Sequence, residues 1–206
     1  MENNYGFSTK DEMIQQLTSF ATNPDDDCIR CKEIIKNSLL QSPELLYLFH
    51  ETDFETELFN KDGTLNTEGD WDVYYGKDGN IRPYLYIPET QEQIKHYLCY
   101  RVMFDDSPNY NKIEKYLQIT FYIFVNGEDA IEPKTGLCRH DLMACMLRDR
   151  FNWSNIFGTQ CRFISDAESI TDNYFLTHTL VFELTTLNSI VKTRQDSRVI
   201  NNKIRQ

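Results

Sequence analysis

Alternating apolar and polar positions in the second half of the chain predict β-strands. The clearest alternation covers 116–125, where every second residue from Leu117 to Val125 is aliphatic or aromatic. The intervening positions are partly apolar too, so we expect a central strand that is covered on one face and contacted on the other. Shorter or less regular alternations predict further strands at Tyr84–Ile87, 96–104, Cys161–Ser165 and 174–186.

Apolar residues at three- and four-residue spacing predict helices in the first 50 residues and one helix among the strands. Thr9 and Glu12 have the spacing of a capping box, and the amphipathic stretch after them ends near Asn23. The Asn23-Pro24 step is a typical start for a second helix. Two more helices are predicted, a short one at Glu44–Phe49 and a longer one at about Leu137–Phe151.

The stretch between these regions, 50–82, has a different character. Two Asp-Gly steps, at 62–63 and 78–79, stand between short aromatic runs. Asp-Gly readily adopts the positive φ angles of tight turns, so we interpret this stretch as a hairpin-rich insertion. The Asn60-Lys61-Asp62-Gly63 run lacks the ligand spacing of a calcium-binding loop, which leaves a turn as its interpretation.

The order of these elements predicts an α+β fold, with a mainly antiparallel sheet flanked by helices. We expect one structural domain with four parts. They are N-terminal helices packed on the main domain (1–49), the hairpin-rich insertion (50–82), a sheet-and-helix core (83–191) and a C-terminal tail (192–206).

Composition and charge narrow the possible functions. Thirteen Phe, twelve Tyr and two Trp provide a substantial core and argue against disorder throughout. No run approaches the roughly 18 apolar residues of a membrane-spanning helix. The net charge of −11 disfavours a protein that grips DNA through its phosphates. The tail is basic instead, with a charge of +4, and we expect it to contact a neighbouring subunit through Lys192, Arg194, Arg198, Lys203 and Arg205.

Cysteine and histidine positions indicate no metal or cofactor. Cys28 and Cys31 have the spacing of half a zinc site, but a second pair is missing. The chain begins without a basic stretch before an apolar run, so we expect no secretory signal and six reduced thiols. The histidines are widely separated in sequence, and we expect each to be an ordinary core or surface group: His50, His96, His140 and His178.

No catalytic constellation is recognisable, so we expect no enzymatic activity. His140 and Asp141 are adjacent, and neighbouring side chains on a helix diverge by about 100°, which disfavours an acid–base dyad. One enzymatic alternative remains, a magnesium-dependent nuclease. Its carboxylates and lysine would come from Glu132-Pro133-Lys134 and from Asp105 and Asp106.

The layout resembles the tail-terminator, tail-completion and neck proteins of tailed bacteriophages. The resemblance covers roughly 34–187. It depends on the segments Lys36–Leu46, Ile81–Pro88, Gln118–Val125, the helix from His140-Asp141-Leu142, and Thr179–Leu184 before a polar tail.

This resemblance implies a structural virion protein that forms a ring, a hexamer or dodecamer, at the head–tail junction or tail end. DNA would pass through the ring without sequence-specific binding, and the neighbours would be connector, portal-ring or tail-tube proteins. The protein would assemble in the host cytoplasm and reside in the virion, without a membrane. The alternative is another phage structural or assembly protein, such as a capsid-associated or baseplate component, or a host adaptor domain.

Overall fold

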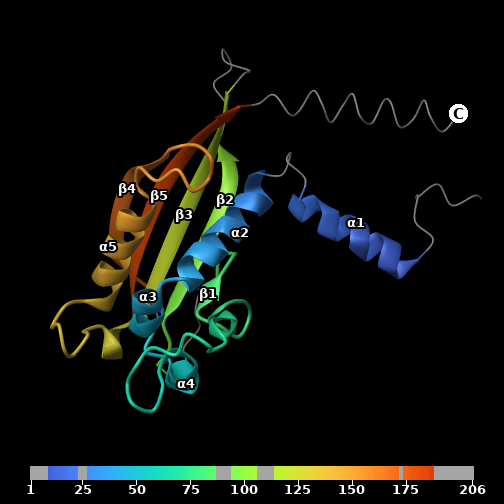
Figure 1. Ribbon diagram of the computed structural model, residues 1–206. Coiled ribbons are helices and arrows are strands. Elements are labelled where there is room, and N and C mark those ends of the chain that lie inside the picture. The colour runs from blue at the N-terminus through green and yellow to red at the C-terminus, as the bar shows by residue number, and fades with distance from the viewer. Residues whose placement is uncertain (1–8, 23–26, 87–93, 106–113, 172–173, 188–206) are drawn as a thin grey trace, which may run out of the picture.

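A five-stranded sheet is the centre of the molecule (Figure 1). The computed structural model describes residues 9–22, 27–86, 94–105, 114–171 and 174–187. The strands lie side by side in the order β1-β2-β3-β5-β4, and every neighbouring pair is antiparallel except β1 with β2. Their bounds are Ile81–Arg82 (β1), Tyr97–Asp105 (β2), Glu114–Asn126 (β3), Cys161–Ile170 (β4) and Phe175–Leu187 (β5). The predicted α+β class, with its mainly antiparallel sheet, is confirmed.

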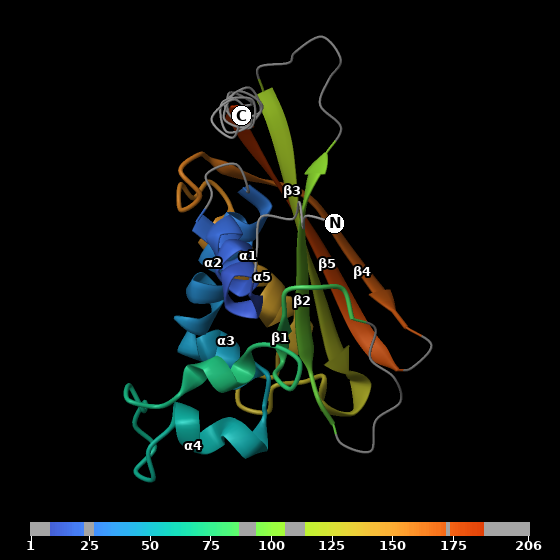
Figure 2. The ribbon, with the colours of Figure 1, turned by 90° about the vertical axis from the view of Figure 1, so that its right-hand side faces the viewer.

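Helices cover one face of this sheet, and among the described residues the other face carries none (Figure 2). The covering helices are α2 (Asp27–Leu40), α3 (Pro43–Leu48) and α5 (Arg139–Phe151). The remaining helical elements are α1 (Lys10–Thr22), α4 (Glu55–Leu58) and the 3₁₀ turns η1 (Thr52–Phe54), η2 (Trp71–Tyr74) and η3 (Gly127–Asp129). None of the described helices is long and apolar enough to cross a membrane.

The first helix stands away from the sheet (Figure 1). Its start is the predicted capping box, in which the Thr9 amide donates to Glu12 and the Glu12 amide donates to the Thr9 hydroxyl, both at 3.2 Å. Its apolar side chains remain exposed: 46% for Met13, 47% for Ile14 and 62% for Leu17. Helix α1 therefore presents an apolar stripe to the outside, whereas α2 and α3 bury theirs.

The main core lies between the sheet and the covering helices. Alternate residues of β3 and β5 face this layer, as their alternation predicts, and Phe121 and Phe182 are fully buried there. The Phe121 ring stacks on Phe151 of α5 at 5.1 Å and meets the Phe182 ring edge-on at 5.8 Å. Aromatic pairs of this kind add to the free energy gained by burying apolar area, so this cluster fixes α5 on the sheet.

A smaller cluster lies on the opposite face, near β1. The Arg82 guanidinium sits 3.8 Å from the centre of the Tyr86 ring and 4.7 Å from that of Tyr97. Cation–π contacts of this geometry hold the chain that follows β1 against β2. The predicted strand at Tyr84–Ile87 is wrong for 84–86, while Ile87 lies outside the described residues. The pairing covers Ile81–Arg82 instead, since Pro83 has no amide hydrogen with which to continue the ladder.

Strand β4 is longer than the predicted Cys161–Ser165 and contains a bulge. Phe163 pairs with Phe182 and Ser165 pairs with Val181, so Ile164 is an extra residue in the ladder. A bulge shifts the alternation of all later residues by one. As a result, Asp166 and Glu168 point to the helix-covered side, opposite Leu180 and His178.

The stretch 50–82 combines short helical turns with tight turns. At the first Asp-Gly step, Gly63 has a φ of +82°, and Phe59 and Leu65 form an antiparallel bridge around it, as expected for a hairpin turn. The second step, 78–79, does not form a hairpin, because the bridge around it, Tyr75 to Ile81, is parallel.

Candidate functional site

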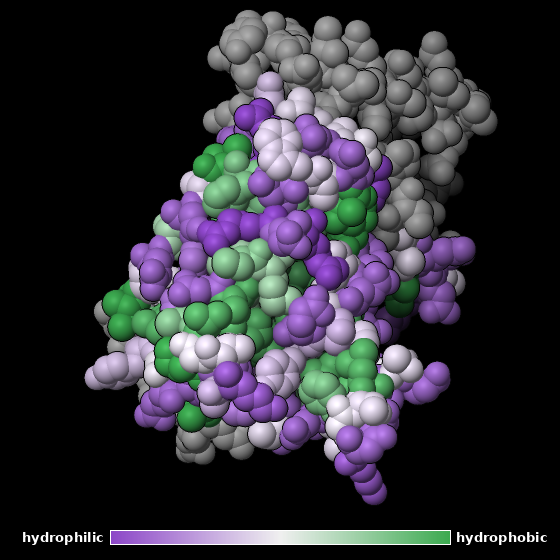
Figure 3. Space-filling model, turned by 60° about the vertical axis from the view of Figure 1, so that its left-hand side comes forward, coloured by the Kyte–Doolittle hydropathy of each residue, from purple (hydrophilic) through white to green (hydrophobic). Residues whose placement is uncertain are grey.

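An apolar groove opens on the helix-covered side of the molecule, between α3 and α5. It has a volume of about 560 Å³. Figure 3 shows apolar side chains gathered on this side among polar ones. The lining comes from α3, the turn after α4, the loop after η3, and α5: Pro43, Glu44, Tyr47, Leu48, Phe59, Leu65, Glu132, Lys134, Thr135, Leu142 and Met146. A surface with this lining is suited to an apolar side-chain partner rather than to a charged substrate.

One wall of the groove is fixed by a buried carboxylate. Glu132 accepts hydrogen bonds from the Tyr47 hydroxyl at 3.1 Å and from the Thr135 amide at 2.6 Å. Burial acts to raise the pKa of Glu132, but the hydrogen bonds from Thr135, Lys134 and Tyr47 outweigh it and lower the pKa to about 2. The carboxylate therefore closes the loop 132–136 and ties it to α3.

The depressed pKa of Glu132 predicts an acid-sensitive contribution to stability. Ionised Glu132 stabilises the fold above its ordinary pKa of 4.5, and this stabilisation is lost as the pH falls toward the folded-state pKa of about 2. The Glu132→Gln variant should therefore have a lower free energy of unfolding than the wild type at pH 6, and the difference should shrink steadily at lower pH. Urea unfolding between pH 6 and pH 3 measures it, with exposed Glu128→Gln as the control. A difference that does not change with pH would contradict the assignment.

A second, partly buried carboxylate, Asp129, joins three elements at the same end of the sheet. It accepts from His50 at 2.6 Å, from His96 at 3.1 Å and from Arg139 at 3.3 Å. The Asn126 amide donates to His96 Nδ1, so the proton of a neutral His96 is on Nε2, which donates to Asp129. Burial lowers the pKa of His96, although Asp129 opposes this shift. This network positions the start of α5, which forms part of the groove.

The other two histidines also lie together. The ring centres of His140 and His178 are 6.0 Å apart, although the two residues are widely separated in sequence. Both side chains are buried, as expected for core groups. His140 and Asp141 form no direct hydrogen bond, since Nε2 and Oδ1 are 3.6 Å apart. Both nevertheless lie next to His178. The sequence pattern that could have revealed the pair is a histidine on the apolar face of 174–186 opposite a strand rich in carboxylates.

The residues of the nuclease alternative are not brought together. Asp105 pairs with Tyr116, whereas Glu132 follows Asn126 at the opposite end of β3, about 30 Å away along the strand. The carboxylate of Glu132 is already engaged by its own loop. Asp106 lies outside the described residues, and Lys134 lines the groove.

The remaining predicted positions are either structural or outside the described residues. Cys31 is buried in the core and Cys28 packs against it. All six cysteines are free thiols, and burial raises the pKa of Cys99 to about 11 and that of Cys161 to about 12. The five basic residues of the tail all lie outside the described residues: Lys192, Arg194, Arg198, Lys203 and Arg205.

The fold is that of an α+β protein with an apolar groove on its helix-covered side, and comparison with known families indicates a phage-associated protein. Residues 42–199 match the YomW family, and the chain belongs to this family. The match begins at α3 and includes the whole sheet, while α1 and α2 precede it. A comparison with curated proteins finds no match.

Proposed function

We propose that this protein is a structural component of a tailed-phage virion. It would form a ring at the head–tail junction or at the tail end, as a tail terminator, tail-completion or neck protein. Membership of a phage-associated family supports the virion setting. The observation that carries the ring is that one chain presents both an apolar helix, α1, and an apolar groove.

Helix α1 has the features of an element that binds a neighbouring copy. Met13 and Leu17 are one helical turn apart, and Ile14 lies beside them, so their exposed side chains form one stripe. Exposed apolar surface of this kind is typical of interaction sites. The groove is apolar and has room for such a stripe. Docking α1 of one copy into the groove of the next is a head-to-tail contact, and repeating it around an axis closes a ring.

The uncovered edges of the sheet offer a second surface through which neighbouring subunits would assemble. Within the described residues, no strand pairs with the outer edge of β4, and β1 covers only Leu98 and Cys99 of β2. Exposed apolar side chains lie along β4, including Ile164 at 50% and Ile170 at 66%. An uncovered edge offers hydrogen-bonding groups to a second chain. Neighbouring subunits would then join their sheets as well as their helices.

Charge is compatible with a channel for DNA. The net charge is −11, and without the +4 of the basic tail the rest of the chain carries −15. Fixed negative charge repels the duplex at short range and is screened beyond about 8 Å in physiological salt. A channel lined with negative charge would let DNA pass through without binding to it. The basic tail would contact the acidic surface of the next subunit.

Purified virions provide the test. We expect the protein to be present in them at a fixed number of copies that is a multiple of six, located by antibody labelling at the head–tail junction or tail end. Phage lacking the gene should produce heads and tails that fail to join, or tails of uncontrolled length, and few infectious particles. Quantitative mass spectrometry and negative-stain microscopy measure both results. Absence from purified virions, with normal particles from the deletion, would contradict the proposal.

A further inference from the structure

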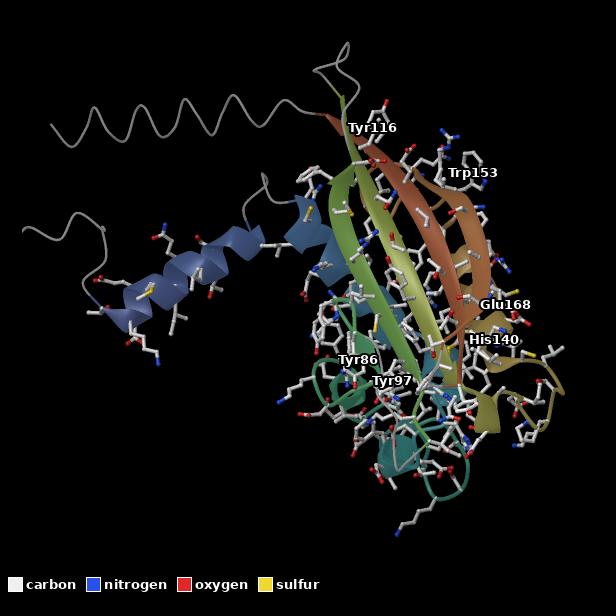
Figure 4. All side chains as sticks on the ribbon, turned by 180° about the vertical axis from the view of Figure 1, so that it is seen from behind. Tyr86, Tyr97, Tyr116, His140, Trp153 and Glu168 are labelled. Carbon is white, nitrogen blue, oxygen red and sulfur yellow. The ribbon has the colours of Figure 1, made fainter. Side chains whose placement is uncertain are left out.

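Two histidines and two carboxylates converge where α5 begins beside β4 and β5. His140 and Asp141 come from the first turn of α5, Glu168 from β4 and His178 from β5. His140 Nε2 lies 3.0 Å from Glu168 Oε1 and 3.6 Å from Asp141 Oδ1. His178 Nδ1 lies 3.6 Å from the same Asp141 oxygen. Figure 4 shows His140 and Glu168 next to one another at this end of the sheet.

The orientation of the His178 ring is fixed from its far side. Its Nε2 is hydrogen-bonded to the carboxylate of Asp166, which is also paired with Arg148. A carboxylate held by an arginine accepts hydrogen bonds, so the Nε2 proton of His178 points to Asp166. In the neutral ring, Nδ1 therefore carries a lone pair and no proton.

This lone pair is directed at a negative charge. His178 Nδ1 is buried without a hydrogen-bond partner, and the side chain is only 8% exposed. The nearest charged oxygen that faces it belongs to Asp141. A nitrogen lone pair and a carboxylate oxygen repel one another unless a proton or a metal ion lies between them. The same holds for His140 Nε2 if its proton is absent, because two carboxylates surround it.

We propose that His140, Asp141, His178 and Glu168 bind one divalent transition-metal ion of the zinc type. One ligand atom from each of the first three residues lies within 4.8 Å of the others. Tetrahedral zinc with bonds of about 2.1 Å separates its ligands by roughly 3.4 Å, so small side-chain rotations complete the site. Two imidazoles with carboxylates are a donor set that zinc and its neighbours bind well.

The surroundings have the other features of a metal site. Asp166 accepts from the imidazole nitrogen that faces away from the ion, the usual arrangement for a ligating histidine. The side chains of Asp141 and Glu168 are 54% and 60% exposed, which gives the ion a path from solvent. A bound ion would fasten α5 to β4 and β5 at the end of the sheet that carries the groove, and it would not depend on ring formation.

Metal binding by the full-length chain tests this proposal. After removal of metals with a chelator, titration with ZnCl₂ should show about one ion bound per chain. Cobalt(II) in its place should give the visible absorption of a tetrahedral site. Asp166→Asn should weaken binding by about 10–100-fold, and Asp141→Asn at least as much. His178→Gln should abolish binding. Asp141 is exposed, so the Asp141→Asn variant is expected to fold even if His178→Gln does not.

Matched controls separate this site from others on the chain. Asp149→Asn removes an exposed carboxylate from the same helix and should leave the affinity unchanged. Cys145→Ser removes the exposed thiol of α5 and should also leave it unchanged. Three results would overturn the proposal: a wild-type chain that binds no stoichiometric zinc, an Asp141→Asn variant that binds as tightly as wild type, or a Cys145→Ser variant that loses the ion. If the wild-type chain binds no stoichiometric zinc, hydrogen bonds alone hold these four side chains together.

Discussion

The Asp129→Ala variant is expected to lose about 3 kcal/mol of its free energy of unfolding. Its partner Arg139 is a charged side chain that is only 2% exposed, and removing the carboxylate leaves this charge buried without compensation. His96, also buried, loses its acceptor in the same step. Urea unfolding of wild type and variant at neutral pH measures the loss.

Two comparisons show whether the loss comes from the network around Asp129. Asp149→Ala removes an exposed carboxylate from α5 and should change stability by no more than about 0.5 kcal/mol. The double variant Asp129→Ala/Arg139→Met should be more stable than Asp129→Ala alone, because it removes the unpaired charge as well. Equal instability of the two would contradict this explanation.

Protonation of Asp129 at low pH should have the same effect on stability as the Asp129→Ala substitution. Burial acts to raise the pKa of Asp129, but hydrogen bonds from His50 and His96 and the charge of Arg139 outweigh it, so the pKa lies below the ordinary 3.8. The stabilisation is therefore present above pH 3.8 and is lost as the pH falls through the lower, folded-state value. Wild type and Asp129→Ala should accordingly become more similar in stability below this pH.

The proposed ring should be abolished by a charge at either half of its contact. Leu17→Glu places a carboxylate in the stripe of α1, and Leu65→Glu places one at the groove, where Leu65 is 38% exposed. Burying an unpaired charge in an apolar contact should weaken it by about 100-fold. We expect both variants to stay monomeric in light scattering under conditions in which the wild type, alone or with virion neighbours, forms rings. Their circular dichroism should be unchanged.

Mixing the two variants tests the direction of the contact. Leu17→Glu retains an intact groove and Leu65→Glu retains an intact helix, so a mixture should form pairs through one good contact and no rings. Leu85→Glu is the control, since Leu85 is 50% exposed and lies on neither surface. Rings of normal size from either single variant would contradict α1-in-groove assembly.

The strand and helix pattern made much of the fold predictable. The alternation at 116–125 correctly predicts the central strand, because one face of β3 packs under the helices while several side chains on its other face are only partly covered. The helix at Leu137–Phe151 is also found, beginning two residues later than predicted, at Arg139. The predicted strand at Tyr84–Ile87 is wrong for 84–86, since these residues follow Pro83 and the Tyr86 ring packs on Arg82 instead of joining the ladder.

The buried polar groups were not predictable from local patterns. His96 and Asp129 are 33 residues apart, and His140 and His178 are 38 apart in sequence, so only the register of the strands brings each pair together. The groove was equally hidden, because its lining comes from four separate segments. The local sequence pattern predicts which residues are buried, whereas the pairing of distant segments decides which buried residues contact one another.

The single extra residue in β4 has a consequence for how this protein can change. Ser165 already pairs with Val181, so a chain lacking Ile164 would keep every later pairing and leave Asp166 and Glu168 on the helix-covered side. A strand that kept Ile164 but paired it with Val181 in a regular ladder would instead turn both acids to the uncovered side, away from His178. Loss of the Ile164 codon would thus straighten the strand and keep acids beside imidazoles, whereas relatives of this protein that retain a residue here but lack the bulge should have no counterpart of the four-residue cluster.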